Sequence, residues 1–290
     1  MPASELSYKS ADGTKIVAYR WEPEDALVNA AVQVTHGMGE HARRYEHVAQ
    51  ALNDAGFVVY AQDHRGHGAT AASAERLGQL GPGGWRLLVE DIHLLNSLIR
   101  AEYPGLPVAL LAHSMGSFAA QQYLLDYSGE VDAVVLTGTT ALDQLEPAFD
   151  LDQPIDLSGL NAAFAPARTD FDWLSRDEAV VDAYVADPLC GFGLDVESGK
   201  EMFVAARRMA DPDAVARIRS DLPVYLAAGE QDPISGAGAL VELVAGRLRA
   251  AGLTGVTVRA YPGARHEILN ETNRDEVTAD ILAWLGPVLA

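Results

Sequence analysis

The chain has 290 residues, of which 49% are hydrophobic and 21% charged, as is typical of a folded globular protein. Its 41 acidic and 21 basic residues give a formal net charge of −20. Such a charge repels phosphate backbones, and no cluster of Lys and Arg offsets it, so nucleic acid is not an expected partner. The single cysteine, Cys190, excludes an internal disulfide and cannot form a thiolate metal site by itself.

The first residues lack a basic segment followed by an apolar one, which a secretory leader requires. No uninterrupted apolar stretch reaches the roughly 18 residues of a membrane-spanning helix. We therefore expect a soluble, cytoplasmic protein.

Residues 6–21 alternate imperfectly around Asp12-Gly13 and predict a β-hairpin. Short apolar runs typical of buried parallel strands follow. Longer segments between them have helical periodicity. This alternation predicts an α/β fold with a mostly parallel sheet and helices on both sides. The predicted strands are Ala30–Thr35, Phe57–Ala61, Val108–Ala112, Val131–Thr137, Val224–Ala228 and Val256–Tyr261, and the predicted helices are Tyr45–Ala55, Trp85–Tyr103, Met115–Tyr127, Ala237–Ala251 and Thr272–Leu285.

One interval breaks the alternation, because about 80 residues separate Thr139 from the run that begins at Leu222. This interval is rich in proline, aromatic and acidic residues. We interpret residues 141–220 as a small, largely helical cap inserted between two parts of the core, residues 1–140 and 221–290.

Ser114 lies between the apolar run 108–113 and a segment with helical spacing. A serine on a sharp strand-to-helix turn projects its hydroxyl out of the sheet, and small residues two positions before and after it let strand and helix approach. Ala112 and Gly116 occupy these positions, so we predict that Ser114 is a nucleophile. The alternative is a serine that caps the helix.

The sequence His36-Gly-Met-Gly-Glu-His41 follows the first parallel strand. Backbone N–H groups of such a loop can stabilise the oxyanion of acyl transfer, and we assign this role to Met38 and Met115. A glycine turn without chemical function remains the alternative. Neither His36 with His41 nor the histidines of His64-Arg-Gly-His67 come with carboxylates in a recognisable metal-binding arrangement, so no metal site and no cofactor are expected.

Asp232 follows the run 224–228, and His266 follows the last predicted strand. Ligands bind at the carboxyl ends of strands in open α/β sheets, so both can converge with Ser114. The order Ser, Asp, His is that of an α/β-hydrolase, with His266 as general base and Asp232 orienting it. One alternative is that His266 is a structural histidine. Another is that Asp232 only forms an Asp-Pro turn, in which case Glu230 is the candidate acid.

The chain resembles the monoacylglycerol lipase and lysophospholipase branch of the α/β-hydrolases, which includes serine aminopeptidase-like members. The matching motifs include His36 to His41, Asp63-His-Arg-Gly-His-Gly68, which we interpret as a structural turn, and His113 to Gly116. Ala112 and Ser117 replace glycines that are usual in the family. The resemblance implies hydrolysis of single-chain lipid esters without a cofactor, an apolar tunnel under the cap, and an alcohol site that includes Gly37, Glu40 and Arg44.

Two features of the cap have alternative interpretations. Cys190 is either a thiol accessible to electrophiles or, as we expect, a buried inert one. Met202, Phe203 and Met209 either press against lipid or substrate or, as we expect, pack against the core. Contact with lipid would allow transient association with a membrane surface. Oligomeric state is not predicted.

Three alternatives to a lipid ester hydrolase remain. An aminopeptidase or amidase of the same fold would use acidic cap residues to hold a substrate amine. A general carboxylesterase would share the same chemistry. A non-catalytic ligand-binding homologue typically lacks one of the three residues of the triad, whereas Ser114, Asp232 and His266 are all present.

Overall fold

The computed structural model describes residues 3–24 and 27–290; residues 1–2 and 25–26, in the predicted first part of the core, lie outside the described residues. Its strands form one sheet in the order β1-β2-β4-β3-β5-β6-β7-β8. β1 (Ser4–Lys9) and β2 (Lys15–Trp21) form the predicted antiparallel hairpin, in which Gly13 has a φ of +86°. β2 also pairs antiparallel with β4, and the remaining neighbours are parallel.

The six predicted parallel strands are confirmed to within two residues at each end. All residues of five of them, β3 to β7, are buried, as continuous apolar runs predict. β8 differs, because it lies at the edge of the sheet and most of its side chains are at least partly exposed. The expectation that β8 is buried on both faces was therefore wrong. The strands are β3 (Ala30–Thr35), β4 (Phe57–Gln62), β5 (Val108–His113), β6 (Ala133–Thr137), β7 (Val224–Gly229) and β8 (Val256–Tyr261).

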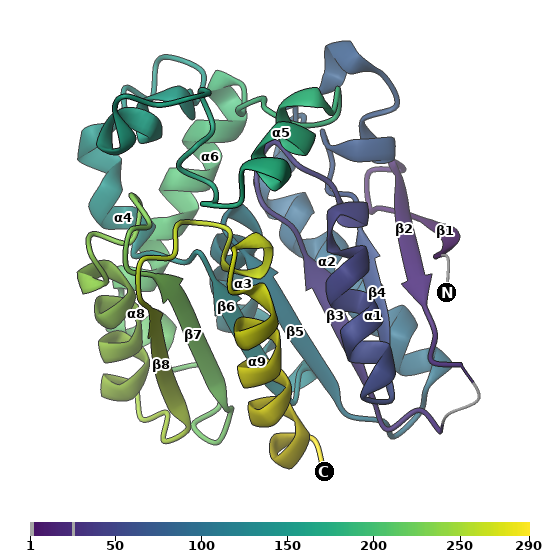
Figure 1. The fold of residues 1–290 in the computed structure, drawn as a ribbon. Helices are drawn as coiled ribbons and strands as arrows, with labels where there is room; N and C mark the ends of the chain where they lie inside the picture. The colour runs from purple at the N-terminus through teal and green to yellow at the C-terminus, as the bar shows by residue number, and fades with distance from the viewer. Residues whose placement is uncertain (1–2, 25–26) are drawn as a thin grey trace.

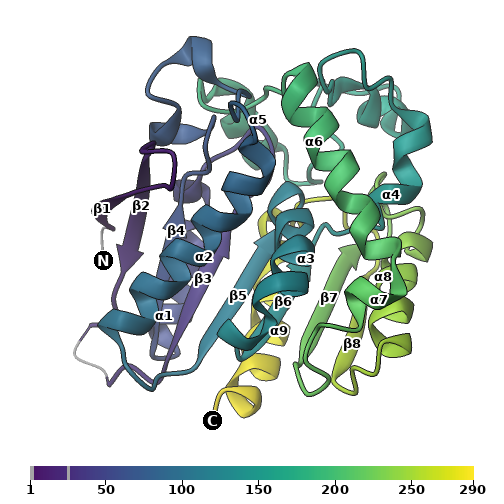
Figure 2. The same cartoon turned by 180° about the vertical axis from the view of Figure 1, so that it is seen from behind.

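Helices cover both faces of the sheet (Figures 1 and 2). α1 (Glu46–Asp54) and α9 (Arg274–Val288) pack on one face, and α2 (Gly84–Glu102), α3 (Met115–Tyr127) and α8 (Ala239–Ala250) on the other. Successive strand residues join different clusters, as the pleat requires: Leu110 packs in the cluster of α3, and Leu111 in that of α1 and α9. Short 3-10 turns connect these elements: η1 (Ala42–Tyr45), η2 (Gly68–Ala71), η3 (Ala74–Arg76), η4 (Ser128–Glu130) and η8 (Ile268–Asn270).

The segment between β6 and β7, which we call the cap, consists of short helices and turns. Its helices α4, α5 and α6 lie above the carboxyl ends of the parallel strands (Figure 1). Met202, Phe203 and Met209 are buried in the main core cluster, so they do not face lipid. The cap elements are α4 (Leu142–Leu145), η5 (Glu146–Ala148), η6 (Ser158–Phe164), α5 (Glu178–Ala186), α6 (Val196–Ala206), η7 (Arg207–Ala210) and α7 (Pro212–Val215).

The loops that follow β3, β5, β7 and β8 carry the predicted site residues. Because these strands are parallel, their carboxyl ends meet at one edge of the sheet. Met38, Ser114 and His266 border a single cavity at this edge, beneath the cap.

Candidate active site

Ser114 lies on a strained turn between β5 and α3. Its φ of +50° and ψ of −124° are unusual for a residue with a side chain. A Cβ atom on Gly116 would lie 2.4 Å from the carbonyl oxygen of Thr35, so the turn requires glycine there. Ala112 and Ser117 fit without disturbing it: Ala112 is buried in β5, and Ser117 Oγ donates a hydrogen bond to Ser114 O (2.6 Å). The backbone thus has the geometry of a nucleophile elbow.

His266 and Asp232 are in direct contact. Nδ1 of His266 donates to Oδ2 of Asp232 at 2.9 Å, and both side chains are buried. Burial alone would lower the pKa of His266, but the charge of Asp232 and its hydrogen bond to the ring raise this pKa above its ordinary value. Asp232 Oδ1 accepts the N–H of Ile234 (3.0 Å), which fixes the carboxylate. Glu230, the alternative acid, is exposed.

The loop after β3 brings Met38 to the same cavity as Ser114. The N–H of Gly37 donates to Oε1 of Glu40 at 2.6 Å, and a Cβ atom on Gly37 would lie 3.1 Å from Ser114 Cβ. Met115 is the first residue of α3, where N–H groups lack partners within the helix. The two assigned oxyanion donors therefore belong to two backbone segments that border the same cavity as Ser114.

Glu40, Arg44 and Glu267 form a buried ionic network beside the cavity. Arg44 donates to both oxygens of Glu267 (2.6 and 2.7 Å) and to Oε2 of Glu40 (2.8 Å). Burial would raise the pKa of Glu267, but Arg44 outweighs it and holds this pKa at about 2. Burial of Glu40 raises its pKa more than Arg44 lowers it. Glu40 and Glu267 border the cavity. Arg44 is connected to it through its hydrogen bonds to these two carboxylates.

Sequence reasoning assigned no role to Glu267, His113 or Gly138. Glu267 follows His266 directly, but its partner Arg44 is 223 residues away. Burial lowers the pKa of His113 to about 3, so its ring is neutral, 4.8 Å from that of His266 between centroids. Gly138 follows β6 with a φ of +53°, and a Cβ atom there would lie 2.8 Å from both imidazoles. The sequence signal that could have indicated Gly138 is its position directly after β6, the neighbour of the strand that leads to Ser114.

The motif Asp63 to Gly68 has a structural role, in agreement with the sequence interpretation. Asp63 accepts the N–H groups of Ala42 (2.9 Å) and Ala69 (2.7 Å). The N–H of His64 donates to the ring of His36 (3.0 Å), and burial lowers the pKa of both histidines. These contacts fix the start of the loop that carries Met38.

The cavity combines a polar end at the sheet edge with apolar walls from the cap. Its volume is about 60 Å³. A fatty acyl chain is larger, so some of the walls must move for such a chain to enter. The apolar lining residues are Phe118, Leu142, Leu145, Phe149, Ile155, Leu157, Leu160, Trp173, Leu174, Met202, Phe203 and Ile234.

A family model described as serine aminopeptidase, S33, matches residues 27–273. The chain belongs to this family. It is 33% identical to a monoacylglycerol lipase of Mycolicibacterium smegmatis over 97% of this chain and 96% of that protein. It is 30% identical to human monoglyceride lipase, over 96% of this chain and 88% of that protein. The resemblance found in the sequence is thereby confirmed.

Solved structures confirm the α/β-hydrolase fold of this family member. A thermostable carboxyl esterase from Bacillus coagulans, in complex with glycerol, has a TM-score of 0.88 and 32% identity, with all of both chains covered. A soluble variant of monoglyceride lipase from Saccharomyces cerevisiae has a TM-score of 0.78 at 20% identity, over 100% of this chain and 97% of that one. Among the described residues, no helix is long and apolar enough to span a membrane.

Proposed function

We propose that this S33 family member hydrolyses esters of single-chain lipids, of the monoacylglycerol or lysophospholipid type, through an acyl-enzyme on Ser114. Similarity to lipases and an esterase over nearly the whole chain supports a carboxylic ester hydrolase. The observation that carries the proposal is the shared cavity, in which Ser114 on its strained turn and His266 bonded to Asp232 border an apolar enclosure.

In the proposed mechanism, His266 takes the hydroxyl proton as Ser114 attacks the ester carbonyl. The N–H groups of Met38 and Met115 stabilise the resulting oxyanion. His266 then gives the proton to the departing alcohol. Water, activated in turn by His266, releases the fatty acid from Ser114. Asp232 holds the imidazole in the required tautomer and stabilises its charged form.

The substrate is placed with its acyl chain among the apolar cap residues and its alcohol at the polar end. Gly37, Glu40 and Arg44 organise the alcohol end in this proposal. Arg44 and Gly37 already bind Glu40, so a glycerol hydroxyl would meet a fixed carboxylate rather than a mobile one. Preorganised polar groups of this kind orient a ligand at low entropic cost.

We infer an entry route for the acyl chain from two adjoining cavities. A second cavity of about 500 Å³ lies next to the inner one. Both are bordered by Leu145, Phe149, Ile155, Leu160 and Ile234, which form the wall between them. Movement of these side chains would connect the cavities. Val185, Leu189 and Val204 expose apolar area on the cap, which supports transient contact with a lipid surface.

A chain-length series of monoacylglycerols and lysophospholipids tests this proposal. We expect hydrolysis of single-chain esters, with kcat/KM rising with chain length as more apolar area is buried. A Ser114→Ala variant serves as the inactive control. Equal rates on all chain lengths, together with full activity on acetate esters, would instead favour a general carboxylesterase.

The aminopeptidase alternative has less support in the structure. The carboxylates that border the cavity are Glu40 and Glu267, and both are already bound to Arg44. A substrate ammonium would have to compete with this guanidinium. We expect much faster cleavage of a monoacylglycerol than of an amino-acid anilide. A fluorophosphonate probe addresses the non-catalytic alternative, because labelling of Ser114 requires an activated serine.

A further inference from the structure

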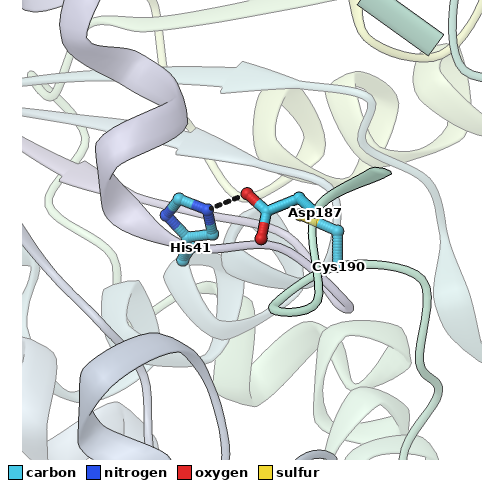
Figure 3. Close-up of side chains that lie close together, drawn as sticks. All are labelled: His41, Asp187 and Cys190. Carbon is cyan, nitrogen blue, oxygen red and sulfur yellow. Dashed lines mark hydrogen bonds and ion pairs between the residues drawn. The ribbon is translucent and has the colours of Figure 1, made fainter. Parts of the chain in front are cut away.

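Three side chains outside the proposed mechanism gather where the cap meets the core. His41 follows the loop that carries Met38, whereas Asp187 and Cys190 lie after α5 in the cap. Figure 3 shows the carboxylate of Asp187 facing the ring of His41, with Cys190 beside Asp187. His41 Nε2 lies 2.9 Å from Asp187 Oδ2. One nitrogen, oxygen or sulfur atom from each residue lies within 4.8 Å of the other two. The fold thus brings a carboxylate and a thiol to His41 from a distant segment of the chain.

We propose that a zinc-like divalent cation binds to His41, Asp187 and Cys190. The bound cation would join the cap to the loop that carries Met38. A mixed set of imidazole, carboxylate and thiolate suits Zn²⁺, whereas Mg²⁺ and Ca²⁺ prefer oxygen ligands. Tetrahedral zinc, with bonds of about 2.0–2.3 Å, separates its ligand atoms by about 3.3–3.8 Å. Because all three ligand atoms lie within 4.8 Å of one another, no separation has to shrink by more than about 1.5 Å, and the 2.9 Å contact between His41 and Asp187 has to widen slightly. Side-chain rotation allows both changes.

Two residues of the cluster border an open cavity, and the charge around the cluster is favourable. His41 and Asp187 border a cavity of about 600 Å³, from which water can take the fourth coordination position. Cys190 interacts electrostatically with Asp187, Glu40 and Glu267 and with the Arg44 guanidinium. Three carboxylates thus oppose one cation, and Arg44 is already paired. A divalent ion therefore enters a region of net negative charge.

Coordination requires a simple exchange of bonds. Burial raises the pKa of the Cys190 thiol, so without an ion it carries its proton. On binding, the S–H bond breaks, the proton passes to solvent and a metal–sulfur bond forms. The hydrogen bond between His41 and Asp187 is replaced by one metal bond to each side chain. The proton on Nε2 of His41 passes through solvent to Nδ1, so that the neutral imidazole binds the ion through Nε2.

A rival group is less suited to a cation. Glu40, His113 and Glu267 also place one ligand atom each within 4.8 Å of the others. Their carboxylates, however, bind Arg44 at 2.6–2.8 Å. A cation there would have to displace a buried guanidinium. At His41 and Asp187 it exchanges their mutual hydrogen bond, and Oδ1 of Asp187 can keep the hydrogen bond from the N–H of Leu189 (2.8 Å).

The position of the site gives it a consequence for activity, which rests on the proposed function. The N–H of Gly191 already donates to Gly39 O (3.0 Å), and a Cβ atom on Gly39 would lie 2.4 Å from Phe192 O. A bound ion would strengthen this junction and hold the cap in its closed position. Because the cavity is too small for an acyl chain, a fixed cap slows entry of long substrates most.

Titration with Co²⁺ tests the site without relying on hydrolysis. The Ser114→Ala protein is used, because it binds ions whether or not the proposed function is correct. We expect one equivalent to bind, with the near-ultraviolet absorption of a cobalt–thiolate bond. Cys190→Ser should lose this band, and Asp187→Asn should weaken binding at least tenfold. Asp182→Asn, a cap carboxylate paired with Arg168, is the matched control and should bind normally.

Two results would refute the proposed site. One is that folded Ser114→Ala protein shows no cobalt–thiolate band, and the other is that Cys190→Ser binds Co²⁺ as tightly as the protein with Cys190. Thermal melting without metal shows that each variant is folded.

Zinc inhibition of the active enzyme tests the junction. We expect Zn²⁺ to lower the rate on a long-chain monoacylglycerol at least tenfold, to affect a short p-nitrophenyl ester less, and to be reversed by a chelator. Cys190→Ser should keep its activity in the presence of Zn²⁺. Equal inhibition of Cys190→Ser would place the ion elsewhere, such as at His113 or His266. Binding without any change in rate would overturn the effect on the cap.

Discussion

The two ends of the cavity are built in different ways. At the sheet edge, buried polar groups are held by hydrogen bonds of 2.6–2.9 Å, as between Arg44 and Glu267 and between His266 and Asp232. On the cap side, Phe149, Leu157 and Leu160 are partly exposed apolar side chains in short turns. Hydrogen bonds are directional and costly to break when buried, whereas apolar contacts tolerate rearrangement. The polar end therefore fixes the chemistry, and the cap can adapt to the substrate.

The largest expected effect is at Ser114. Replacement by alanine removes the proposed nucleophile, so kcat should fall by about 10⁵-fold or more. Thermal unfolding should stay close to that of the unchanged protein, because the buried networks remain. Near-normal hydrolysis of a p-nitrophenyl ester by pure Ser114→Ala protein would refute the assignment.

Asp232→Asn should lower kcat by about 10³- to 10⁴-fold, because an amide favours the wrong tautomer of His266. The matched variant is Glu230→Gln, at the exposed alternative position, which should retain activity. If a steady-state assay showed a larger loss of kcat in Glu230→Gln than in Asp232→Asn, Glu230 would be the acid instead.

Arg44→Met tests the polar network as a unit. It leaves Glu40 and Glu267 buried without their cation, so the free energy of unfolding should drop by about 3–5 kcal/mol. Arg43→Met is the control, because Arg43 is exposed and lies 3.9 Å from its partner Glu46. Urea denaturation measures both; a loss below about 1 kcal/mol in Arg44→Met would show that the network is not stabilising.

The pH profile should report His266. Protonated imidazole cannot accept the serine proton, so kcat/KM falls about tenfold per pH unit below the pKa of His266. Because Asp232 raises this pKa, the acidic limb should lie above pH 6.5 and move to lower pH in Asp232→Asn. The pKa of His113, at about 3, keeps that group out of this range. An acidic limb that stays in place in Asp232→Asn would contradict the assignment.

The smallest expected effect is on the cap side. Phe149→Ala opens the wall between the inner and outer cavities, so the preference for long over short acyl chains should change by about tenfold. Leu98→Ala, at an exposed position on α2, should leave this preference unchanged. Competition between two monoacylglycerols in one reaction measures the ratio directly.

The strands and the Ser114 turn were predictable because their signals are local. Five continuous apolar runs gave strands β3 to β7, and Ala112, Ser114 and Gly116 marked the elbow. Contacts between distant segments were not predictable, because no periodicity connects Arg44 with Glu267 or His41 with Asp187. The first and last residues of the short helices and turns in the cap were also not predictable, because such short elements have no periodic pattern. The roles assigned to the site residues and the division into core and cap stay predictions.

The cap and the base share a backbone connection. The N–H groups of His266 and Glu267 donate to the carbonyls of Trp173 (3.3 Å) and Leu174 (2.8 Å), both in the cap. The loop that carries the imidazole is thus held to the cap by two backbone hydrogen bonds. Such bonds do not depend on the side chains at these positions. Exchange of caps between homologues must therefore preserve the path of the backbone at 173–174. A graft that moves this path would misplace His266 even if every side chain of the triad were retained.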